Sequence, residues 1–453
     1  MIRLQGFAPD LDPTTPGILQ SVTNALPTTR GMIGAPTPVN TIWFLDGASR
    51  GCATIETLAA GTKTYAGQGN YLFELNGAGL NLVGSGYATG TGRIVFTSFG
   101  NAVLVCNGSD GVGLAASTGG YFSPISGAPK ARIVESVGLF VLAFGTTYGS
   151  TTSPDGWHSC ALGNYLSWTP SATTQAANGR LLDSAGEITA ARRINDGIIA
   201  YKKRSMYYGL YVGGDIIWQW SQVATNVGCA GQDAVVNVGG VHYFVGADDL
   251  YAFDGSYPRS IGGNIKRWFF KDADSARLKN IVAVHDRNDD HVWFWYSSKT
   301  AASGFFDTAI VYNMLTGAWG RVSLVVQDVM THQSGTDALS VVISGYPYYL
   351  VKTLSGACSA ASMQTFDIGD DDQYSRLSKV RLRFIDNPTS ATVTHHHKSS
   401  LGDSYTTGTI DTMADNKVNF GQSARWHKLK IDTVGDFEIS GLTITESVQN
   451  GNK

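Results

Sequence analysis

A serine motif near the N-terminus is the first feature of the chain that could carry chemistry. The segment Gly47-Ala-Ser-Arg-Gly51 matches GxSxG, a motif in which the serine stands on a sharp turn between a strand and a helix, activated by a histidine and a carboxylate. Gly61 and Gly67 leave little room for a helix after it, and no histidine or acidic partner can be identified. We therefore predict a plain turn, and no catalytic residue.

A second segment, Ser153-Pro-Asp-Gly-Trp157, resembles the Asp-box of sialidases. In that motif Asp and Gly form a hairpin turn on a propeller and the Trp packs beneath it, so the motif is structural even in glycosidases. Cleavage of a glycoside would require a pair of carboxyl groups, one of them an acid with a raised pKa, and no such pair stands out. The segment favours a propeller and does not indicate hydrolysis.

Histidines are the first candidates for metal ligands, and His395-His-His397 is their densest cluster. Adjacent side chains on a strand point to opposite faces, so at most His395 and His397 share one. Two histidines are too few for a metal site, and we interpret them as solvated or as subunit contacts. His285 and His291 are six positions apart in a predicted turn and do not fit HExxH.

Acidic clusters could offer oxygen ligands to calcium, but none has the spacing of an EF-hand, and aspartate is common in turns. The glycine-rich segment Gly84–Gly92 lacks the Lys-Ser/Thr of a phosphate-binding loop. We therefore predict neither a metal nor a cofactor, with calcium left open at three clusters: Asp248-Asp249 with Asp254, Asp286 with Asp289-Asp290, and Asp370–Asp372.

Basic stripes raise the question of nucleic acid. Lys202-Lys-Arg204 with Tyr207 and Tyr208 mixes cations and aromatic rings as DNA-contacting surfaces do. The net charge of −3 argues against a dedicated nucleic-acid binder, and solvated faces or ion pairs between subunits are the commoner use of such stripes. Two further cationic strand faces are Lys379/Arg381/Arg383 and Arg425/Lys428/Lys430.

Composition points to an all-β protein. The chain of 453 residues contains 54 Gly, 10 Trp, 20 Tyr and 19 Phe, and only 15% of its residues are charged. Glycine permits tight turns and aromatic side chains fit half-buried strands, so many short strands are expected. A surface with so little charge is weakly protected against association, which suits a subunit of an assembly.

Cysteine usage and hydropathy bear on the compartment. The five cysteines are far apart, without a CxxC motif, and indicate buried thiols in a protein folded in a reducing cytoplasm. No stretch approaches about 20 consecutive apolar residues, and the first residues lack the apolar core of a signal peptide. We expect neither a membrane-spanning segment nor export by that route.

The chain divides into three predicted parts. Residues 1–40 hold six of the 13 prolines, and we expect an extended Pro-rich N-terminal arm lying across a neighbouring surface, or else a partly disordered terminus. From 41 to 356 strand runs recur at the spacing of one propeller blade, ~40–50 residues. These runs are Thr41–Leu45, Tyr71–Leu75, Ala102–Cys106, Leu139–Phe144, Gly197–Lys202, Val241–Val245, His291–Tyr296 and Ala338–Ser344.

We prefer one β-propeller to a stack of sandwich domains, because no sharp linker separates the runs. Ile261–Lys271 predicts a short helix. Residues 357–453 have a different character: Leu377–Ile385 and Trp426–Asp432 alternate apolar with polar residues, and Phe437–Thr445 switches parity at Gly441, which indicates a bulge. This part predicts a small C-terminal β-sandwich.

The order of these parts resembles a known family. The leader Gly6–Pro16, the segment Ala200–Tyr208, and Ala424–Ile431 followed by Gly435–Ile444 are together similar to the tail-nozzle, or packaged-DNA stabilisation, proteins of short-tailed bacteriophages and related prophage tail proteins. The resemblance implies a structural virion protein and not an enzyme, made in the bacterial host cytoplasm. It implies that six copies ring a channel below the portal and adaptor, retain the packaged genome and carry tail fibres or tailspikes and a distal plug.

In that setting genomic DNA would pass through the ring without sequence-specific binding. Each phosphate contact would have to be broken during ejection, so we expect a neutral to acidic lumen with basic residues at subunit contacts. The alternative function is a propeller that binds or cleaves carbohydrate at the host surface. Its sugar-stacking side chains would be Trp157, Trp168, Trp218 and Trp220, although tryptophan in a blade core is the commoner use.

Overall fold

The computed structural model describes residues 1–58, 61–76, 79–89, 92–115, 121–331, 339–345 and 348–450, without the side chains of 114, 115 and 446–450. Strands make up nearly all of its regular structure. Within the described ranges the one α-helix is α1 (Lys266–Asp272), accompanied by the 3-10 helices η1 (Gln232–Ala234) and η2 (Leu278–Asn280). The predicted helix is present but begins five residues later than Ile261, because Ile261 still pairs its amide with the Leu250 carbonyl.

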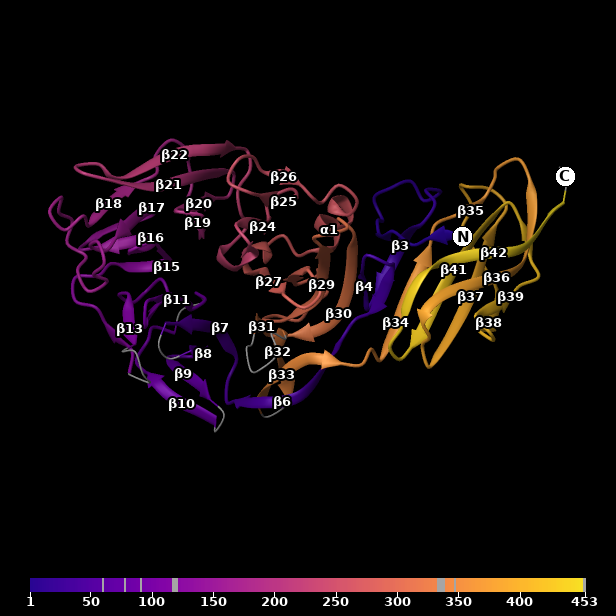
Figure 1. Cartoon of the computed structure of the whole chain (residues 1–453), viewed down its shortest axis with the longest axis horizontal. Coiled ribbons are helices and arrows are strands. Elements are labelled where there is room, and N and C mark those ends of the chain that lie inside the picture. The colour runs from indigo at the N-terminus through magenta and orange to yellow at the C-terminus, as the bar shows by residue number, and fades with distance from the viewer. Residues whose placement is uncertain are drawn as a thin grey trace.

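Five consecutive antiparallel sheets of four strands each form most of the larger part of the molecule (Figure 1). We number them blades 1 to 5. Their strands are β7–β10 (Ser49–Thr57, Gly61–Gln68, Tyr71–Asn76, Gly79–Gly84), β11–β14 (Val95–Phe99, Ala102–Cys106, Gly113–Ala115, Ser123–Pro124), β15–β18 (Lys130–Val137, Phe140–Tyr148, Thr151–Ser159, Ala177–Arg180), β19–β22 (Ile188–Ile194, Gly197–Lys202, Ser205–Gly213, Ile217–Thr225) and β23–β26 (Val235–Val238, Val241–Val245, Leu250–Phe253, Arg259–Ser260).

Two further four-stranded units complete the ring, although neither is a separate sheet of four consecutive strands. Blade 6 is β27–β30 (Val282–Asp286, His291–Tyr296, Phe306–Asn313, Trp319–Val326), and it continues into a larger sheet. Blade 7 is β31 (Asp328–Thr331), β32 (Leu339–Gly345) and β33 (Tyr348–Gly356), with β6 (Thr37–Leu45) as its fourth strand. The predicted run at Ala338–Ser344 corresponds to β32, and residue 338 lies outside the described ranges.

The first strands of these units contact one another in a closed order, β7, β11, β15, β19, β23, β27, β31 and again β7. Radial sheets whose inner strands form a ring are the defining arrangement of a β-propeller. The predicted propeller is confirmed, and the stack of sandwich domains is wrong. The pairing of β6 with β33 closes the ring with a strand from the N-terminal side of the chain.

The first 35 residues differ from the predicted arm. They form β1 (Ile2–Arg3), β2 (Gly6–Phe7), β3 (Ile18–Thr23), β4 (Ala25–Pro27) and β5 (Met32–Gly34). Each of β1, β3, β4 and β5 pairs with a strand from a distant part of the same chain. The physical reason is burial: the apolar side chains of this segment, Leu4, Phe7, Leu19, Val22 and Met32, are almost completely buried.

Residues beyond 357 form nine strands that share two sheets with the N-terminal segment. One sheet has the order β2-β3-β34-β41-β37-β38, and the other contains β5-β42-β36-β39. We call these strands together the two-sheet module. The predicted bulge is present, because the β36–β42 register shifts between Arg383↔Gly441 and Phe384↔Ile439. The strands are β34 (Ala360–Thr365), β35 (Ile368–Gly369), β36 (Tyr374–Asp386), β37 (Ser390–Lys398), β38 (Thr406–Thr412), β39 (Lys417–Asn419), β40 (Ser423–Ala424), β41 (Trp426–Val434) and β42 (Glu438–Asn450).

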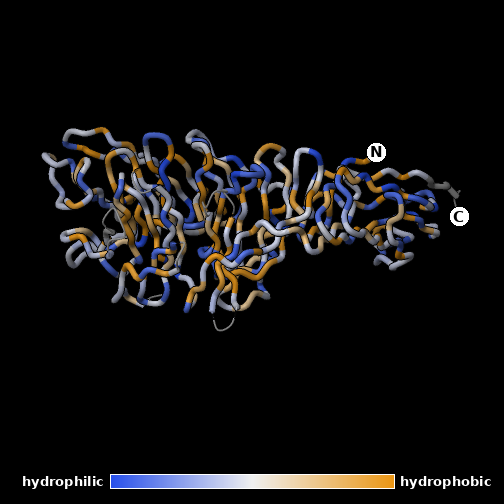
Figure 2. The backbone as a smooth tube through the Cα atoms, turned by 60° about the horizontal axis from the view of Figure 1, so that its bottom comes forward, coloured by the Kyte–Doolittle hydropathy of each residue, from blue (hydrophilic) through white to orange (hydrophobic). Residues whose placement is uncertain are grey.

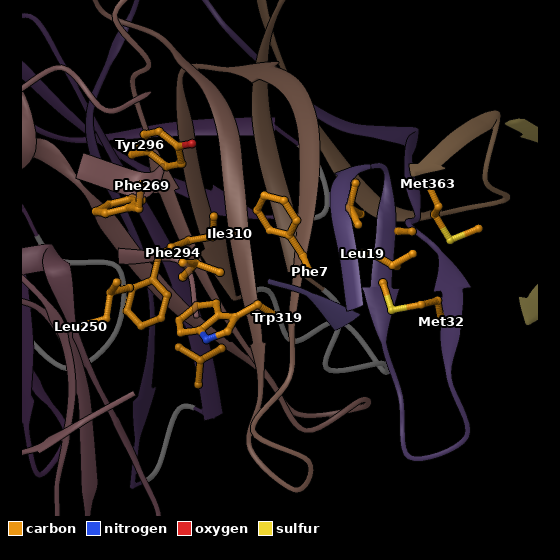
Figure 3. Close-up of a cluster of buried hydrophobic side chains, with 14 of the residues drawn as sticks. Phe7, Leu19, Met32, Leu250, Phe269, Phe294, Tyr296, Ile310, Trp319 and Met363 are labelled. Carbon is orange, nitrogen blue, oxygen red and sulfur yellow. The ribbon is translucent and has the colours of Figure 1, made fainter. Parts of the chain in front are cut away.

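One sheet crosses from the propeller to the two-sheet module. Its order runs β27-β28-β29-β30-β4-β5-β42-β36-β39, so blade 6 continues through β4 and β5 into the module. A single buried apolar cluster spans the same junction, and Figure 3 shows Trp319 and Phe294 on the propeller side with Leu19, Met32 and Met363 on the other. We call this junction the seam.

The seam also has polar contacts. Both oxygens of the Asp10 carboxylate accept backbone amides at the start of α1, from Arg267 at 2.6 Å and Trp268 at 3.0 Å. The Phe7 ring packs edge-on against the Trp268 ring at 4.8 Å between centroids. Apolar and polar stretches alternate along both parts of the chain (Figure 2), and in the described residues no helix has the length and apolar character needed to cross a membrane.

Candidate functional site

The mouth of the central channel is a concave surface to which several blades of the propeller contribute. Hollows of about 460 Å³ and 340 Å³ open there, and a third of about 200 Å³ lies against the inner strands β7, β11, β27 and β31. Arg93 lines all three hollows. The mouth is built where the inner strands begin, so side chains of several blades converge there.

Arg93 reaches across this channel. It stands just before β11 in blade 2, yet its Nη2 donates to Asp328 Oδ1 of blade 7 at 2.9 Å, and its Nε lies 2.5 Å from Asp233 Oδ2 at the start of blade 5. The Asp328 side chain is fully buried. Burial by itself would lower the pKa of Arg93, but Asp328 and Asp233 outweigh it and raise that pKa, so the guanidinium remains charged.

Alternating charges continue from Arg93 around the mouth. Arg192 of β19 lies 3.6 Å from Asp233 and 3.3 Å from Glu135 of β15. Burial raises the pKa of Glu135, and the neighbouring guanidinium of Arg192 opposes that rise only in part. Five ionic side chains from five blades thus form one network, and Arg93 bridges the channel within it.

The GxSxG serine belongs to the same mouth but not to a nucleophile elbow. Ser49 is the first residue of strand β7, so a strand follows it and not a helix. Its Oγ donates to Asp328 Oδ2 at 2.7 Å and lies 3.1 Å from Cys52 Sγ. Burial raises the pKa of the Cys52 thiol, which therefore stays protonated. The expected plain turn is replaced by a strand start that anchors Asp328.

The segment resembling an Asp-box is placed differently from the prediction. Ser153–Trp157 lies inside β17 and forms no hairpin turn, because a register shift between Phe144 and Thr146 accommodates it within the β16–β17 ladder. The Trp157 side chain packs in the blade as expected, 5.4 Å from Trp220 between ring centroids. Its neighbour Asp155 accepts a hydrogen bond from Arg180 at 2.9 Å.

The histidine cluster contains a buried pair that the sequence did not suggest. His395 and His397 share a face of β37, with ring centroids 5.7 Å apart, as predicted. The solvated interpretation is wrong for His395, which is fully buried, with its Nε2 2.8 Å from His427 Nδ1 on β41. Burial lowers the pKa of His395 to about 4. His427 has the same strand parity as Leu429 and Ile431, and that parity was the signal that could have placed it in the core.

The acidic clusters serve turns and ion pairs. Within the described ranges no group of three or more His, Cys, Asp or Glu side chains is arranged to hold a metal ion. Asp249 accepts from Ser260 Oγ at 2.8 Å and from Lys266 Nζ at 3.2 Å. Asp371 accepts from Trp426 Nε1 at 2.7 Å. Of the glycine-rich segment at 84–92, residues 90 and 91 lie outside the described ranges.

Two of the basic stripes each have one lysine buried in the interior. Lys202 is buried and its Nζ donates to the carbonyl oxygens of Leu181 at 2.6 Å and Ser184 at 2.5 Å. Lys428 is buried too, with its Nζ 2.9 Å from Asp367. The hypothesis that Lys202 contacts DNA is therefore wrong. On the third stripe Lys379 and Arg381 are half-buried, and Arg383 is exposed on β36.

The four tryptophans proposed for sugar stacking lie away from the mouth of the channel. Trp157, Trp168 and Trp218 are buried, and Trp220 is half-buried against the same apolar cluster between blades 3 and 4. None of them lines the hollows at the mouth. These tryptophans therefore pack in the blade cores, which is the more common use of tryptophan in a propeller, and do not form a sugar-stacking surface at the mouth.

Comparison with known proteins yields likenesses of shape only. No family model and no curated protein matches the chain. Among solved structures it is similar to the WD40 domain of Pan2 from Neurospora crassa, with 8% identity, a TM-score of 0.43, and coverage of 70% of this chain and 95% of that one. It is also similar to the extracellular domain of BT4673 from B. thetaiotaomicron, with 10% identity and a TM-score of 0.46. That match covers 84% of this chain, which spans only 46% of the BT4673 chain.

Proposed function

We propose that this protein is a structural subunit of a bacteriophage tail, a nozzle or tail-tube protein that forms a ring below the portal and adaptor. In this role it retains the packaged DNA and conducts it on ejection. The function depends on shape and on subunit contacts, and the protein needs no catalytic residue, metal or cofactor for it. Its partners are further copies of itself, six to a ring, together with the portal or adaptor above and the fibres, spikes or plug below.

The observation that carries the proposal is the seam. One sheet continues from blade 6 through β4 and β5 into the two-sheet module, with β30 and β4 paired at Arg321↔Ala25 and β5 and β42 paired at two positions. The shared apolar cluster and the Asp10 contacts at α1 add side-chain support. A rigid, elongated subunit of this kind suits a wall that must resist internal pressure.

The channel of the single propeller is a second point of support. Because Arg93 bridges it between Asp328 and Asp233, the propeller does not offer an open passage for a DNA duplex. In a tail tube the conduit must then lie between copies of the chain, around the symmetry axis of the ring. The proposal therefore assigns DNA passage to the assembly and leaves the propeller as a wall element.

Particle labelling and mass measurement together test the proposal. Mass photometry of the purified chain should detect a ring of about six copies, and an antibody against the chain should label tails of particles released by the bacterial host. A chain that stays monomeric at every concentration and is absent from particles would contradict it. Binding or cleavage of polysaccharide by that monomer would favour the alternative of a glycan-directed propeller.

A further inference from the structure

Strand β22 is an unprotected edge. It has nine residues, none of them charged and none a proline, and the described residues pair it with β21 alone, through a ladder with two register shifts. Edge strands present a row of unpaired backbone N–H and C=O groups, and soluble proteins usually protect them by charge, proline, short length or a covering element. An edge without these features is suited to pairing with a strand of another molecule.

The outer strands of other blades are protected in such ways. Those of blades 2 and 5, β14 and β26, have two residues each, and β18 of blade 3 has four, including Arg180. The outer strand of blade 6 is covered by β4. The outer strand of blade 7, β6, contains Pro38. Blade 1 is the exception, because its outer strand β10 has six residues and also lacks charge and proline, although it is shorter than β22.

Apolar side chains extend this edge at one end. The tip between β21 and β22 exposes Val212 and Ile216, at 44% and 68% of their surface. The neighbouring loop of blade 3 contributes Leu162 and Leu166, at 42% and 54%, and residues 160–176 contain no charged residue. A hydrogen bond of 3.2 Å from Tyr211 Oη to Gln175 Oε1 links the two segments. Asp215 is exposed at the same tip, and it is the one charged residue among β22, this tip and the loop 160–176.

A second free edge lies toward the opposite end of the molecule. Strand β38 is the last strand of its sheet, has seven residues, and exposes 62% of Ile410. Its one charged side chain, Asp411, accepts the Asn419 amide at 2.7 Å and so is already used within the chain. Figure 1 places β22 and β38 toward opposite ends of the long axis.

We infer that β22 of one copy pairs with β38 of the next copy, so that subunits join head to tail through a shared sheet. Two different edges at opposite ends give a heterologous contact, which repeats from copy to copy and closes into a ring when the rotation permits. The choice of a second copy as the partner rests on the proposed function. The contact satisfies the backbone groups of both edges and covers Ile216 and Ile410.

Edge-blocking variants test the contact. Ser221, exposed on β22, is replaced in Ser221→Lys, and Ile410 on β38 is replaced in Ile410→Lys. We expect either lysine to raise the concentration at half-assembly at least about tenfold, equivalent to about 1.4 kcal/mol. The matched control is Asn178→Lys on β18, which already carries Arg180, and it should assemble as the wild type does. Equal thermal midpoints of all four proteins establish that each is folded.

Cross-linking identifies the two strands. A short bismaleimide should join Gln219→Cys protein to Ile410→Cys protein in a mixture, and neither variant alone should give more product than the wild type with its native thiols. Cross-linking of Gln219→Cys with itself would indicate a twofold contact and overturn the inference. A ring unaffected by both lysines would overturn the inference and leave the proposed function standing. A wild-type monomer that is absent from particles would overturn both.

Discussion

Arg93 and Asp328 form a hydrogen bond of 2.9 Å from Nη2 to Oδ1 although 235 positions separate them in the chain. The pair connects blade 2 to blade 7. Blade 7 is the unit that β6 completes by pairing with β33, so the contact links blade 2 to the blade that closes the ring. Asp233 holds the same guanidinium from the side of blade 5. Three blades therefore depend on one side chain at the mouth of the channel.

Replacement of Arg93 should destabilise the closed ring. In Arg93→Ala the buried carboxylate of Asp328 loses its cation, and removal of one partner of a buried ion pair costs about 3 kcal/mol. The free energy of unfolding in urea measures this loss. Arg132→Ala is the control, since Arg132 and Glu187 form an ion pair with both side chains substantially exposed, worth less than about 1 kcal/mol. Equal effects of the two variants would contradict the assigned role.

Acid should weaken the two-sheet module through His395. Burial holds its pKa at about 4 in the folded chain, against an ordinary value of 6.5. Between these values the unfolded chain binds a proton that the folded chain excludes, so this contribution to stability is complete above pH 6.5 and decreases as the pH falls toward 4. The groups that face His395 are His427, Gln422 and His397.

The thermal midpoint measured between pH 7.5 and 4.5 tests this dependence. The wild type should lose more stability over that range than His395→Gln, in which the titrating group is gone. His242, whose pKa burial also lowers to about 4, contributes equally to both proteins, so their difference reports on His395 together with its hydrogen-bond partner His427. Parallel curves for the two proteins would show that His395 does not contribute.

Replacement of Gly441 by any residue with a side chain should weaken the pairing of β1 with β42. A Cβ atom there would lie 2.2 Å from the Ile2 carbonyl oxygen, where β1 pairs with β42. Gly441→Ala should therefore displace β1 at a cost of about 1–3 kcal/mol, visible as faster hydrogen exchange at Ile2–Phe7. Gly402→Ala is the control, because no atom lies within 4 Å of its Cβ position. Unchanged exchange in Gly441→Ala would contradict the close approach.

Replacement of Lys202 should lower the stability of the fold without changing the affinity for DNA. Lys202→Ala leaves the buried carbonyl groups of Leu181 and Ser184 without their donor, at a cost of about 1–3 kcal/mol. Thermal unfolding should detect this loss, while the affinity for duplex DNA in a filter-binding assay should not change. The adjacent Lys203 is exposed, and Lys203→Ala should leave stability as it is. A loss of DNA affinity in Lys202→Ala alone would contradict its structural role.

Local pattern was sufficient to predict strand runs of the propeller, although not the number of blades or which runs share a blade. The predicted run Val241–Val245 coincides with β24, and the bulge beside Gly441 follows from a change of parity. Such features depend on residues close together in the chain. They required no knowledge of which distant strands would meet.

Pairings between strands, and contacts between side chains, that lie far apart in the sequence could not be predicted. Strands β1, β4 and β5 have only two or three residues each, too few to show a period, and each pairs with a strand hundreds of positions away. The importance of Arg93 was hidden for the same reason, since nothing near it in the sequence marks Asp328. His395 was misplaced because its partner His427 comes from another strand of the sheet.

The pairing of early strands with late ones bears on how the chain is made. During synthesis β6 leaves the ribosome long before β33, its only ladder partner in the described residues, and β1 and β5 precede β42 by an even greater length of chain. Blades 1 to 5 can complete their own hairpins as they emerge, whereas blade 7 and the module must wait. The nascent protein thus carries apolar, unpaired N-terminal strands through most of translation, which makes this interval the time when it most needs protection by chaperones.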